Sequence, residues 1–460
     1  MKRTTQSSKY PTCSVVVLNY NGSKVIKNTL NSLLKLNYPK NKFEVWIVDN
    51  NSQDNSQKII KEFSKKHNNF HFIFSKDNLG FAGGNNLAIK KSRSKYIVLL
   101  NNDCIVDENW LLNLVKTAEK QHKVFSVGSK ILLFPKFIRF SINGFEGKSS
   151  DISVKLTRSK LLSFYGLKEN SIKHTYFSDR SISFDLFVYP NVSDEKNLEF
   201  KVILNSSDYN KNIFKLFIVG NSNNNKLEIN PYLIKKHKGK TSLTFKINPK
   251  IIKAFLFDKI QNAGSFVFHD GYGRDIGAVV SYGEQDYEPD INQYNRDKEV
   301  FSTCGASCLY NREVLEKIGG LSESFFMYYE DTELSWRARN YGYKNYYSCQ
   351  SVVRHLHGFS SKEWSEFFIT QVEKSRLINL FFSTPSNVFY KELFKFASNS
   401  FYSLLKQRQS IKIKALFNLM TDYIALVREK QRLYSGIYQQ RKHRIKKTYK
   451  EIISGRWLFD

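Results

Sequence analysis

Five short apolar runs constrain the fold of this chain more than any other feature. They occupy residues 14–19, 43–49, 70–75, 96–101 and 124–133, and helical patterns fit between them. Continuous apolar runs of this length are typical of parallel strands that helices cover on both faces. The first third of the chain is therefore predicted to be an α/β open sheet built from βαβ units.

Three of the predicted strands end in side chains that can bind a ligand. These polar ends are Asn19-Tyr20-Asn21, Asp49-Asn50 and Asn101-Asn102-Asp103. In open α/β sheets, ligands bind beyond the carboxyl ends of the strands. Asp103 lies between an apolar strand and a predicted helix, so its carboxylate suits a hard divalent cation. The alternative from these residues alone is an aspartate that caps the next helix.

A glycine-rich segment, NLGFAGGNN at residues 78–86, opens a predicted helix after the third strand. It lacks the GxGxxG spacing of a dinucleotide site and the lysine of a P-loop, so both of these sites are excluded. Its glycines allow the backbone to approach a phosphate or a sugar closely. The residues expected to meet the ligand here are Asn78, Gly80, Gly83 and Asn85.

An adjacent carboxylate pair, Glu330-Asp331, follows an aromatic run and precedes an amphipathic pattern. Leu334, Ala338 and Tyr341 share one stripe, which predicts a helix with Asp331 near its N-terminus. A negative charge is favourable at that end, and a carboxylate there is a candidate general base. An ordinary acidic helix cap is the alternative.

Charge and cysteine content limit the partners and the compartment. The formal net charge of +29 over 460 residues points to anionic partners such as nucleotide phosphates, nucleic acid or an anionic membrane. Five cysteines without metal-ligand spacing indicate reduced thiols in a cytosolic protein. The N-terminal apolar run is too short for a signal peptide, and no run of 18 apolar residues predicts a transmembrane helix. No nucleic-acid-binding motif accompanies the charge.

The middle and the end of the chain differ in character. Alternating segments between about residues 140 and 260 predict an antiparallel β module, with a sandwich as the leading model. Helical signals return after Asn262. From about residue 364 the chain is helical and basic, and residues 390–404 and 413–427 each carry an apolar stripe. Such a stripe can lie on an anionic bilayer or pack on the protein. A cationic run follows, formed by Arg441, Lys442, Arg444, Lys446, Lys447 and Lys450.

Several segments, in this order, resemble the family 2 glycosyltransferases, particularly their rhamnosyltransferase-like bacterial branch. The segments are VVVLNYNG, WIVDNNSQDNS, NLGFAGGNN, VLLNND, CGASCLYNREVLEKIGG and FFMYYEDTELSWRARNYGY. The resemblance covers about residues 13–137 and 258–383. It implies a GT-A fold that binds a nucleotide-diphosphate sugar, a divalent metal (Mg or Mn), and inverting transfer by single displacement.

The resemblance also assigns roles to positions of this sequence. Asp49 would contact the nucleotide base, and Asn19, Tyr20, Asn21 and Asn102 would line the donor pocket. Asp103 would bind the metal. His355 would lie near the metal and the diphosphate, although His357 is close enough to compete for that role. Asp331 would deprotonate the acceptor, with Glu330 as a supporting carboxylate or alternative base.

Two features depart from the family pattern. The metal-binding segment is Asn101-Asn102-Asp103 instead of Asp-x-Asp, which leaves one carboxylate. A β module of roughly 120 residues also separates two halves that are usually close in sequence. The predicted parts are an N-terminal catalytic half, an inserted β-rich module, a C-terminal catalytic half and a basic amphipathic helical extension, at residues 1–139, 140–257, 258–383 and 384–460.

The expected function is transfer of a sugar from dTDP-rhamnose or a UDP-sugar to a saccharide or lipid-linked saccharide acceptor. This would occur in cell-surface glycan synthesis, in the cytoplasm or peripherally on the inner face of the cell membrane. The alternative is a non-catalytic glycan- or membrane-binding protein with a vestigial transferase domain. Nucleic acid is not an expected partner.

Overall fold

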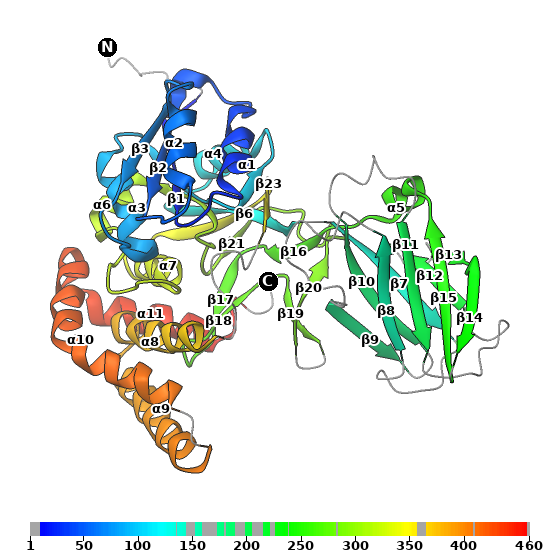
Figure 1. Cartoon of the computed structure of the whole chain (residues 1–460). Coiled ribbons are helices and arrows are strands. Elements are labelled where there is room, and N and C mark those ends of the chain that lie inside the picture. Colours follow the sequence, from blue (N-terminus) through cyan, green and yellow to red (C-terminus); the bar gives the residue numbers. More distant parts are fainter. Residues whose placement is uncertain are drawn as a thin grey trace. The chain divides into compact units, whose positions relative to one another are not determined.

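A computed structural model describes most of the chain, which forms two compact units (Figure 1). The described residues are 10–134, 136–143, 152–158, 173–178, 181–188, 198–204, 215–220, 226–237, 239–281, 284–356, 365–407 and 410–457. Unit 1 comprises Met1–Ile131, Asn262–Ile276 and Asn295–Asp460. Unit 2 comprises Leu132–Gln261 and Gly277–Tyr294.

The centre of unit 1 is a parallel sheet with the strand order β4-β1-β2-β3. These strands are β1 (Cys13–Asn19), β2 (Phe43–Asp49), β3 (Phe70–Phe74) and β4 (Tyr96–Asn101). The register sets Asn19 opposite Asp49 and Leu18 opposite Asn101, so the polar strand ends meet at one edge. The predicted α/β class and the predicted strands are confirmed.

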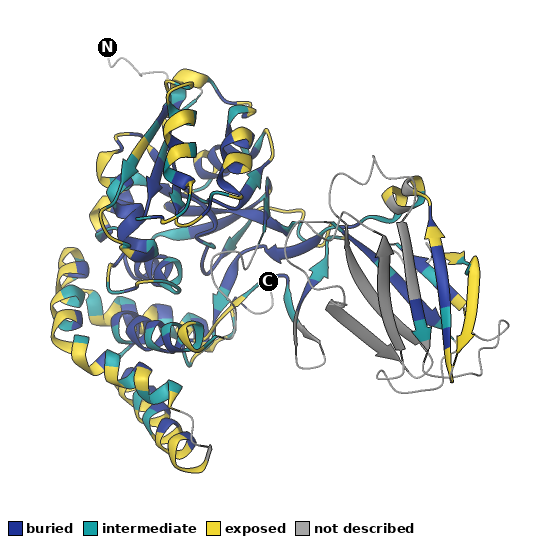
Figure 2. Ribbon diagram, in the orientation of Figure 1, coloured by how far each residue is buried: buried dark blue, intermediate teal, exposed yellow. Residues whose placement is uncertain are grey.

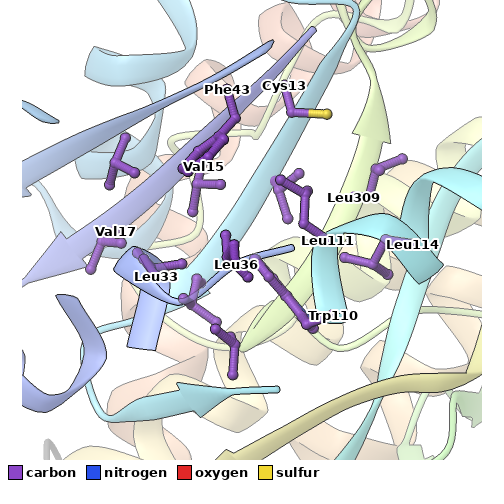
Figure 3. Packing of buried hydrophobic residues seen from close by; sticks show 14 of the residues in the cluster. Cys13, Val15, Val17, Leu33, Leu36, Phe43, Trp110, Leu111, Leu114 and Leu309 are labelled. Atoms are coloured by element: carbon purple, nitrogen blue, oxygen red, sulfur yellow. The ribbon is translucent and has the colours of Figure 1, made fainter. Parts of the chain in front are cut away.

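Helices cover both faces of this sheet because successive strand side chains point to opposite faces. Val15 and Val17 pack with α1 (Ile26–Leu34) and α4 (Trp110–Lys120), as Figure 3 shows. Val16 on the same strand packs in a second cluster with α3 (Gly80–Lys91), α6 (Arg312–Ile318) and α7 (Glu330–Asn340). The helix α2 (Ser56–Ser64) adds Ile60 to the first cluster, and a short 3-10 turn, η1 (Lys40–Lys42), precedes β2.

Antiparallel strands extend unit 1 beyond the parallel core. The strand β22 (Ser307–Asn311) lies between β4 and β6 (Val124–Leu133). The long strand β23 (Lys344–His355) pairs with β5 (Cys104–Val106) and β21 (Lys298–Val300), and sets His355 opposite Cys104. This pairing brings the end of β23 to the loop after β4.

The segment directly after Asn262 forms strands, and the predicted helices return farther along the chain at α6 and α7. β17 (Ser265–Val267) and β18 (Gly273–Asp275) make a hairpin. Gly264, Gly271 and Gly277 have φ values of 101°, 87° and 104°, a conformation that glycine adopts readily and that ends a helix. These glycines set the turns that enter, close and leave the hairpin.

Unit 2 contains two antiparallel sheets, as expected for the inserted module. One has the order β13-β12-β7-β10-β9 and the other has the order β14-β15-β11-β8. Phe140 and Ile218 are buried in the first sheet, and Leu243 and Phe245 in the second. The strands are β7 (Lys136–Asn143), β8 (Ile152–Arg158), β9 (Lys173–Ser178), β10 (Ser181–Val188), β11 (Leu198–Leu204), β12 (Lys215–Val219), β13 (Lys226–Ile229), β14 (Leu233–His237) and β15 (Lys240–Ile247).

The remaining elements of unit 2 are α5 (Pro249–Phe255), β16 (Lys259–Asn262), β19 (Ala278–Ser281) and β20 (Glu284–Pro289). Within them, Lys259 Nζ lies 2.8 Å from Asp286 Oδ1, and both side chains are buried. A buried charge of this kind is tolerated because its partner compensates it.

The C-terminal part of unit 1 is helical, as predicted. It contains α8 (Glu366–Ser383), α9 (Ser386–Gln407), α10 (Ile411–Leu433), the turn η5 (Ser435–Ile437) and α11 (Arg441–Ile453). Leu377 of α8, Leu426 of α10 and Ile445 of α11 join the second core cluster. Figure 2 shows extensive exposed surface on α9 and α10. Among the described residues, no helix has the length and apolarity needed to cross a bilayer.

Candidate active site

A buried hydrogen-bond network joins the carboxyl ends of β1, β2 and β4. Asn19 Nδ2 donates to Asp49 Oδ2 at 2.9 Å, and Asn102 Nδ2 donates to Asn19 Oδ1 at 2.8 Å. The backbone at Gly22 approaches this network so closely that an added Cβ would lie 2.2 Å from both Asn102 Nδ2 and Asn19 Oδ1. A side chain at position 22 would therefore disrupt the floor of the predicted donor pocket.

The loops at the rim of this pocket are held by further bonds. Asp49 Oδ1 accepts from the backbone N–H of Ser52 at 3.0 Å and from Gln57 Nε2 at 3.1 Å. Asn21, whose φ is 50°, donates its backbone N–H to Ser52 Oγ. Tyr20, between Asn19 and Asn21 in the sequence, is 42% exposed, so its side chain is accessible to a ligand. The contact of Asp49 with a nucleotide base stays a prediction.

The glycine-rich loop contacts the segment that precedes the carboxylate pair. The N–H of Phe81 donates to the carbonyl of Phe326 at 2.7 Å, and an added Cβ at Gly80 would lie 2.2 Å from the same carbonyl oxygen. Asn78 Oδ1 accepts from the Gly80 N–H at 3.0 Å. Gly80, with φ at 69°, therefore allows two parts of the site to meet.

The other two residues predicted in this loop make contacts within their own helix. An added Cβ at Gly83 would lie 2.8 Å from Leu79 Cβ. Asn85 is buried and donates from Nδ2 to the Phe81 carbonyl at 2.9 Å. Contact of this loop with phosphate or sugar stays a prediction.

Asp103 and His355 form the candidate metal centre. Asp103 Oδ1 lies 3.1 Å from His355 Nε2, and the two side chains are only 4% and 8% exposed. Asn101 Nδ2 lies 3.5 Å from the same ring nitrogen. The structure therefore brings together the two metal ligands predicted from the β4 loop and from β23. His357 lies outside the described residues.

These residues fit a hard divalent cation. One potential ligand atom each from Asp103, Cys104 and His355 lies within 4.8 Å of the others. The Cys104 thiol is buried in the apolar core and donates to the Ala306 carbonyl at 3.7 Å. A carboxylate and an imidazole then remain as the available donors, and Mg²⁺ is usually bound by one or two carboxylates together with the phosphates of a substrate.

Asp331 lies in the first turn of α7, as predicted. Its Oδ2 accepts from the backbone N–H of Gly305 at 2.7 Å, and its Oδ1 accepts from the N–H of Thr332 at 2.6 Å. Burial raises the pKa of this carboxyl above its ordinary value, and the two N–H bonds oppose the rise. A carboxylate in such surroundings is a stronger base than one in water.

Glu330 occupies a more apolar position than its neighbour. Its side chain is buried, and among the described residues Oε2 has no hydrogen-bond partner. Burial, together with the charge of Asp331, raises the pKa of Glu330 to about 8. The two carboxyls therefore differ in protonation at neutral pH: Glu330 is neutral, and Asp331 is the one that ionises more readily.

An unusual backbone holds the start of α7 in place. Tyr328 and Tyr329 both have φ at 69°, a left-handed conformation that is costly for residues other than glycine. Tyr329 Oη accepts from the Gly273 N–H at 3.1 Å, which ties this segment to the β17–β18 hairpin. Strain of this kind persists where the surrounding structure fixes it, and it is frequent at functional sites.

The same hairpin contributes Asp275, a residue that the sequence reasoning missed. Ser265 Oγ donates to Asp275 Oδ1 at 2.7 Å. Burial raises the pKa of Asp275 to about 6; the Ser265 bond opposes the rise, and the Asp331 charge adds to it. The available signal was an aspartate directly after Gly271-Tyr272-Gly273-Arg274, a turn-rich sequence that could have marked a hairpin.

The loop at Gly305 and Ala306 connects the two parts of the site. Gly305 donates to Asp331, while the Ala306 carbonyl accepts from the Asn101 N–H at 3.0 Å and from Cys104 Sγ. The Leu356 N–H also donates to the Asp103 carbonyl at 3.1 Å. The candidate base and the candidate metal ligands are therefore attached to one hydrogen-bonded framework.

Comparison with known proteins gives a family match for the N-terminal part of the chain. Residues 14–165 match the model of Glycosyl transferase family 2. Glycosyltransferase AglE of Haloferax volcanii is 32% identical over 111 residues, which is 24% of this chain and 36% of that protein. Poly-beta-1,6-N-acetyl-D-glucosamine synthase of Staphylococcus epidermidis is 33% identical over 108 residues, which is 24% of this chain and 26% of that protein.

The matched segments span about a quarter to a third of these two relatives. Among solved structures, a mannosyltransferase from Pyrobaculum calidifontis in complex with GDP-Man and Mn²⁺ aligns over 98% of this chain and 89% of its own, at 11% identity and a TM-score of 0.41. GalNAc-T7 with UDP, GalNAc and Mn²⁺ aligns over 92% of this chain and 58% of its own, at 11% identity and a TM-score of 0.47.

Proposed function

We propose that this chain, whose residues 14–165 belong to glycosyl transferase family 2, transfers a sugar from a nucleotide-diphosphate donor to a saccharide hydroxyl with inversion. The observation that carries the proposal is the position of Asp331. Its carboxylate lies at the N-terminus of α7, bonded to Gly305 in the loop that also bonds the β4 end. Inverting transfer by single displacement needs one base, and the proposal assigns that role to Asp331.

In the proposed reaction Asp331 takes the proton from the acceptor hydroxyl as that oxygen attacks the anomeric carbon. The new glycosidic C–O bond forms as the bond to the nucleotide diphosphate breaks, and the electron pair leaves with the diphosphate. Glu330, neutral at pH 7 because its pKa is about 8, adds no second negative charge beside the base. The Gly305 N–H holds Asp331 in place for the proton transfer.

Asp103 and His355 are the residues that would hold a divalent Mg or Mn ion. When bound, the ion neutralises charge on the leaving diphosphate. The strand-end network of Asn19, Asp49 and Asn102 would fix the loops around the nucleotide. Tyr20, Asn21, Asn78, Gly80, Gly83 and Asn85 complete the proposed donor-binding set.

The donor and acceptor are proposed from the family and from the names of the relatives. The rhamnosyltransferase-like segments favour dTDP-rhamnose. The matched poly-beta-1,6-N-acetyl-D-glucosamine synthase and the matched poly(ribitol-phosphate) beta-N-acetylglucosaminyltransferase of Staphylococcus aureus favour UDP-N-acetylglucosamine. The names of these two relatives favour a polymeric acceptor. A lipid-linked acceptor in cell-surface glycan synthesis, at the inner face of the membrane, stays a prediction from the resemblance.

A donor panel tests the proposal. Purified protein with Mn²⁺ is incubated with dTDP-rhamnose, UDP-N-acetylglucosamine, UDP-glucose or GDP-mannose, and nucleotide release is measured with and without an oligosaccharide acceptor. We expect one donor to be consumed faster when acceptor is present. Binding of a donor or glycan without turnover of any donor would favour the alternative, a non-catalytic binding protein.

A further inference from the structure

The helices α9 and α10 are apolar on two sides, although each helix has only one side packed against the protein. In α10, Leu419 and Leu426 are buried, while Phe417, Met420 and Ile424 are 66%, 68% and 68% exposed. A surface helix normally carries polar residues on its outer side. Packing among the described residues therefore does not explain the outer side of α10.

The helix α9 shows the same arrangement. Phe389 and Phe396 are buried, whereas Phe394 is 74% exposed and Leu405 is 78% exposed. Tyr390, Phe394, Phe401 and Leu405 follow a helical spacing that places them on one stripe. Exposed apolar residues scattered singly are common, but a continuous stripe marks an interaction surface.

The two stripes are adjacent. Tyr390 Oη, on the α9 stripe, lies 3.5 Å from Tyr423 Oη of α10, at the edge of the α10 stripe. Figure 2 shows exposed surface along both helices, which belong to the same unit. We call this surface the α9–α10 apolar face; its members are Tyr390, Phe394, Phe401, Leu405, Phe417, Met420, Tyr423 and Ile424.

Both helices of this face carry a net positive charge. The helix α9 has three lysines and one glutamate, a formal charge of +2. The helix α10 has five basic and two acidic residues, a formal charge of +3. A second copy docked by two-fold symmetry would set two like net charges against each other, whereas an anionic bilayer surface would attract this charge.

The cations of α11 can attract an anionic membrane, but this helix offers little exposed apolar surface. Ile445 and Ile452 of α11 are buried in the protein, and Arg444 donates to the Tyr341 carbonyl. Lys442, Lys446, Lys447 and Lys450 are exposed. This helix can therefore add electrostatic attraction, while the apolar contact with lipid must come from elsewhere.

We propose that the α9–α10 apolar face inserts into the headgroup and upper acyl region of an anionic membrane, with the surrounding lysines and arginines at the phosphates. This is the mode of an interfacial amphipathic helix, which lies in the membrane plane without crossing it. Tyrosines at the edge suit the boundary between apolar and polar layers. The inference goes beyond the proposed transfer reaction, because vesicle binding needs neither donor nor acceptor.

Flotation with lipid vesicles tests this proposal. The full-length protein is mixed with phosphatidylcholine vesicles that contain phosphatidylglycerol, and the partition coefficient is compared with that of a Phe394→Gln, Phe417→Gln, Met420→Gln, Ile424→Gln variant. All four side chains are at least 66% exposed, so the fold should tolerate their loss. We expect a fall of at least about 100-fold, because each large apolar side chain kept out of lipid weakens partitioning by roughly tenfold.

A matched control replaces exposed apolar residues outside the face. Phe72 and Ile291 are 42% and 55% exposed, and a Phe72→Gln, Ile291→Gln variant should bind as the wild type does. A Lys442→Gln, Lys446→Gln, Lys447→Gln, Lys450→Gln variant should bind less at low salt and lose most of its salt dependence. These two variants separate the apolar contribution from that of charge.

Insertion itself is measured with a Phe394→Trp variant and bromine-labelled lipids, which quench only tryptophans that enter the acyl region. We expect quenching beyond that of the wild-type tryptophans. Unchanged flotation of the four-residue apolar variant would overturn the proposal. A second result would also overturn it: the wild-type protein does not bind vesicles but forms a dimer, and the four-residue variant is a monomer. The face would then join two copies of the chain. Transfer to an acceptor in solution, measured separately, shows whether the variant retains its catalytic site.

Discussion

The backbone N–H of Gly305 donates to Asp331 Oδ2 at 2.7 Å, and this bond joins the first turn of α7 to the loop beside β4. An added Cβ at Gly305 would lie 3.3 Å from the same oxygen, so the contact depends on close backbone approach. The bond opposes the effect of burial on the pKa of Asp331. A base held in this way keeps its position while its proton affinity stays above that of an aspartate in water.

Replacement of Asp331 tests the base directly. Asp331→Asn keeps the size of the side chain but cannot accept a proton, so kcat should fall by about 100-fold to 10,000-fold. Donor affinity, measured by calorimetry, should change little because Asp331 serves the acceptor. Glu313→Gln is a matched control, since Glu313 is an exposed acid in the first turn of α6. Wild-type turnover by a folded Asp331→Asn protein would contradict the assignment.

The protonation of Glu330 makes the stability of the protein depend on pH. In the unfolded chain this carboxyl ionises from its ordinary value of 4.5, but in the folded protein it stays protonated up to about 8. The unfolded state therefore loses its proton first, and the contribution to stability falls as pH rises between these values. The loss is on the order of 3–5 kcal/mol at pH 8 and above.

Glu330→Gln should remove this pH dependence, because glutamine does not titrate. Urea unfolding at pH 5 and pH 8 gives the free energy of unfolding for the wild type and the variant. We expect the wild type to lose more stability than Glu330→Gln between the two values. Equal losses would mean that Glu330 ionises normally in the folded protein.

The metal centre predicts a linked loss of ion binding and transfer. Asp103→Asn should weaken Mn²⁺ binding by at least about tenfold, since it removes the only carboxylate of the described pair. Excess EDTA should stop transfer by the wild type, and added Mn²⁺ should restore it. Calorimetry of Mn²⁺ binding provides a readout that is independent of activity.

Asp107→Asn is the control for this centre. Asp107 directly follows β5 and therefore lies near Asp103 in the sequence. Its exposed side chain accepts a hydrogen bond from the Asn109 N–H and so stabilises a turn. Its replacement should leave Mn²⁺ affinity unchanged. If transfer persisted in excess EDTA, the proposed role of a metal ion in the reaction would be wrong.

Patterns of apolar residues in the sequence predicted the parallel strands and the helix α7. The apolar runs gave the parallel strands because both faces of a covered sheet need apolar side chains. The stripe of Leu334, Ala338 and Tyr341 gave α7, and all three are buried in one core cluster. The position of Asp331 at the start of that helix followed from the same periodicity.

Features set by long-range contacts escaped prediction. Asp275 lies on a hairpin whose turns depend on glycines. The backbones of Ser265 and Ser302, far apart in sequence, hold this hairpin by hydrogen bonds to each other. The stripes of α9 and α10 could be found in the sequence, but periodicity does not say which side of a helix the protein covers. The structure shows that buried and exposed apolar residues occur on opposite sides of the same helices.

Asp275 should influence the reaction through the ionisation of Asp331. The charge of Asp331 raises the pKa of Asp275, so the two carboxyls interact, and removal of one negative charge favours ionisation of the other. Transfer requires ionised Asp331 and therefore declines as pH falls. In Asp275→Asn the acidic limb of the kcat/KM profile should move to lower pH.

Ser265→Ala provides a weaker change in the same direction. It removes the 2.7 Å hydrogen bond to Asp275 Oδ1, which favours the ionised form of that carboxyl. The pKa of Asp275 should then rise further, so the carboxyl stays neutral over a wider range of pH. Asp331 then ionises beside a neutral neighbour, and the acidic limb should again move to lower pH, by less than in Asp275→Asn. A purely structural role for Asp275 predicts a lower rate with no movement of this limb in either variant, and the pH profiles of the two variants decide between these roles.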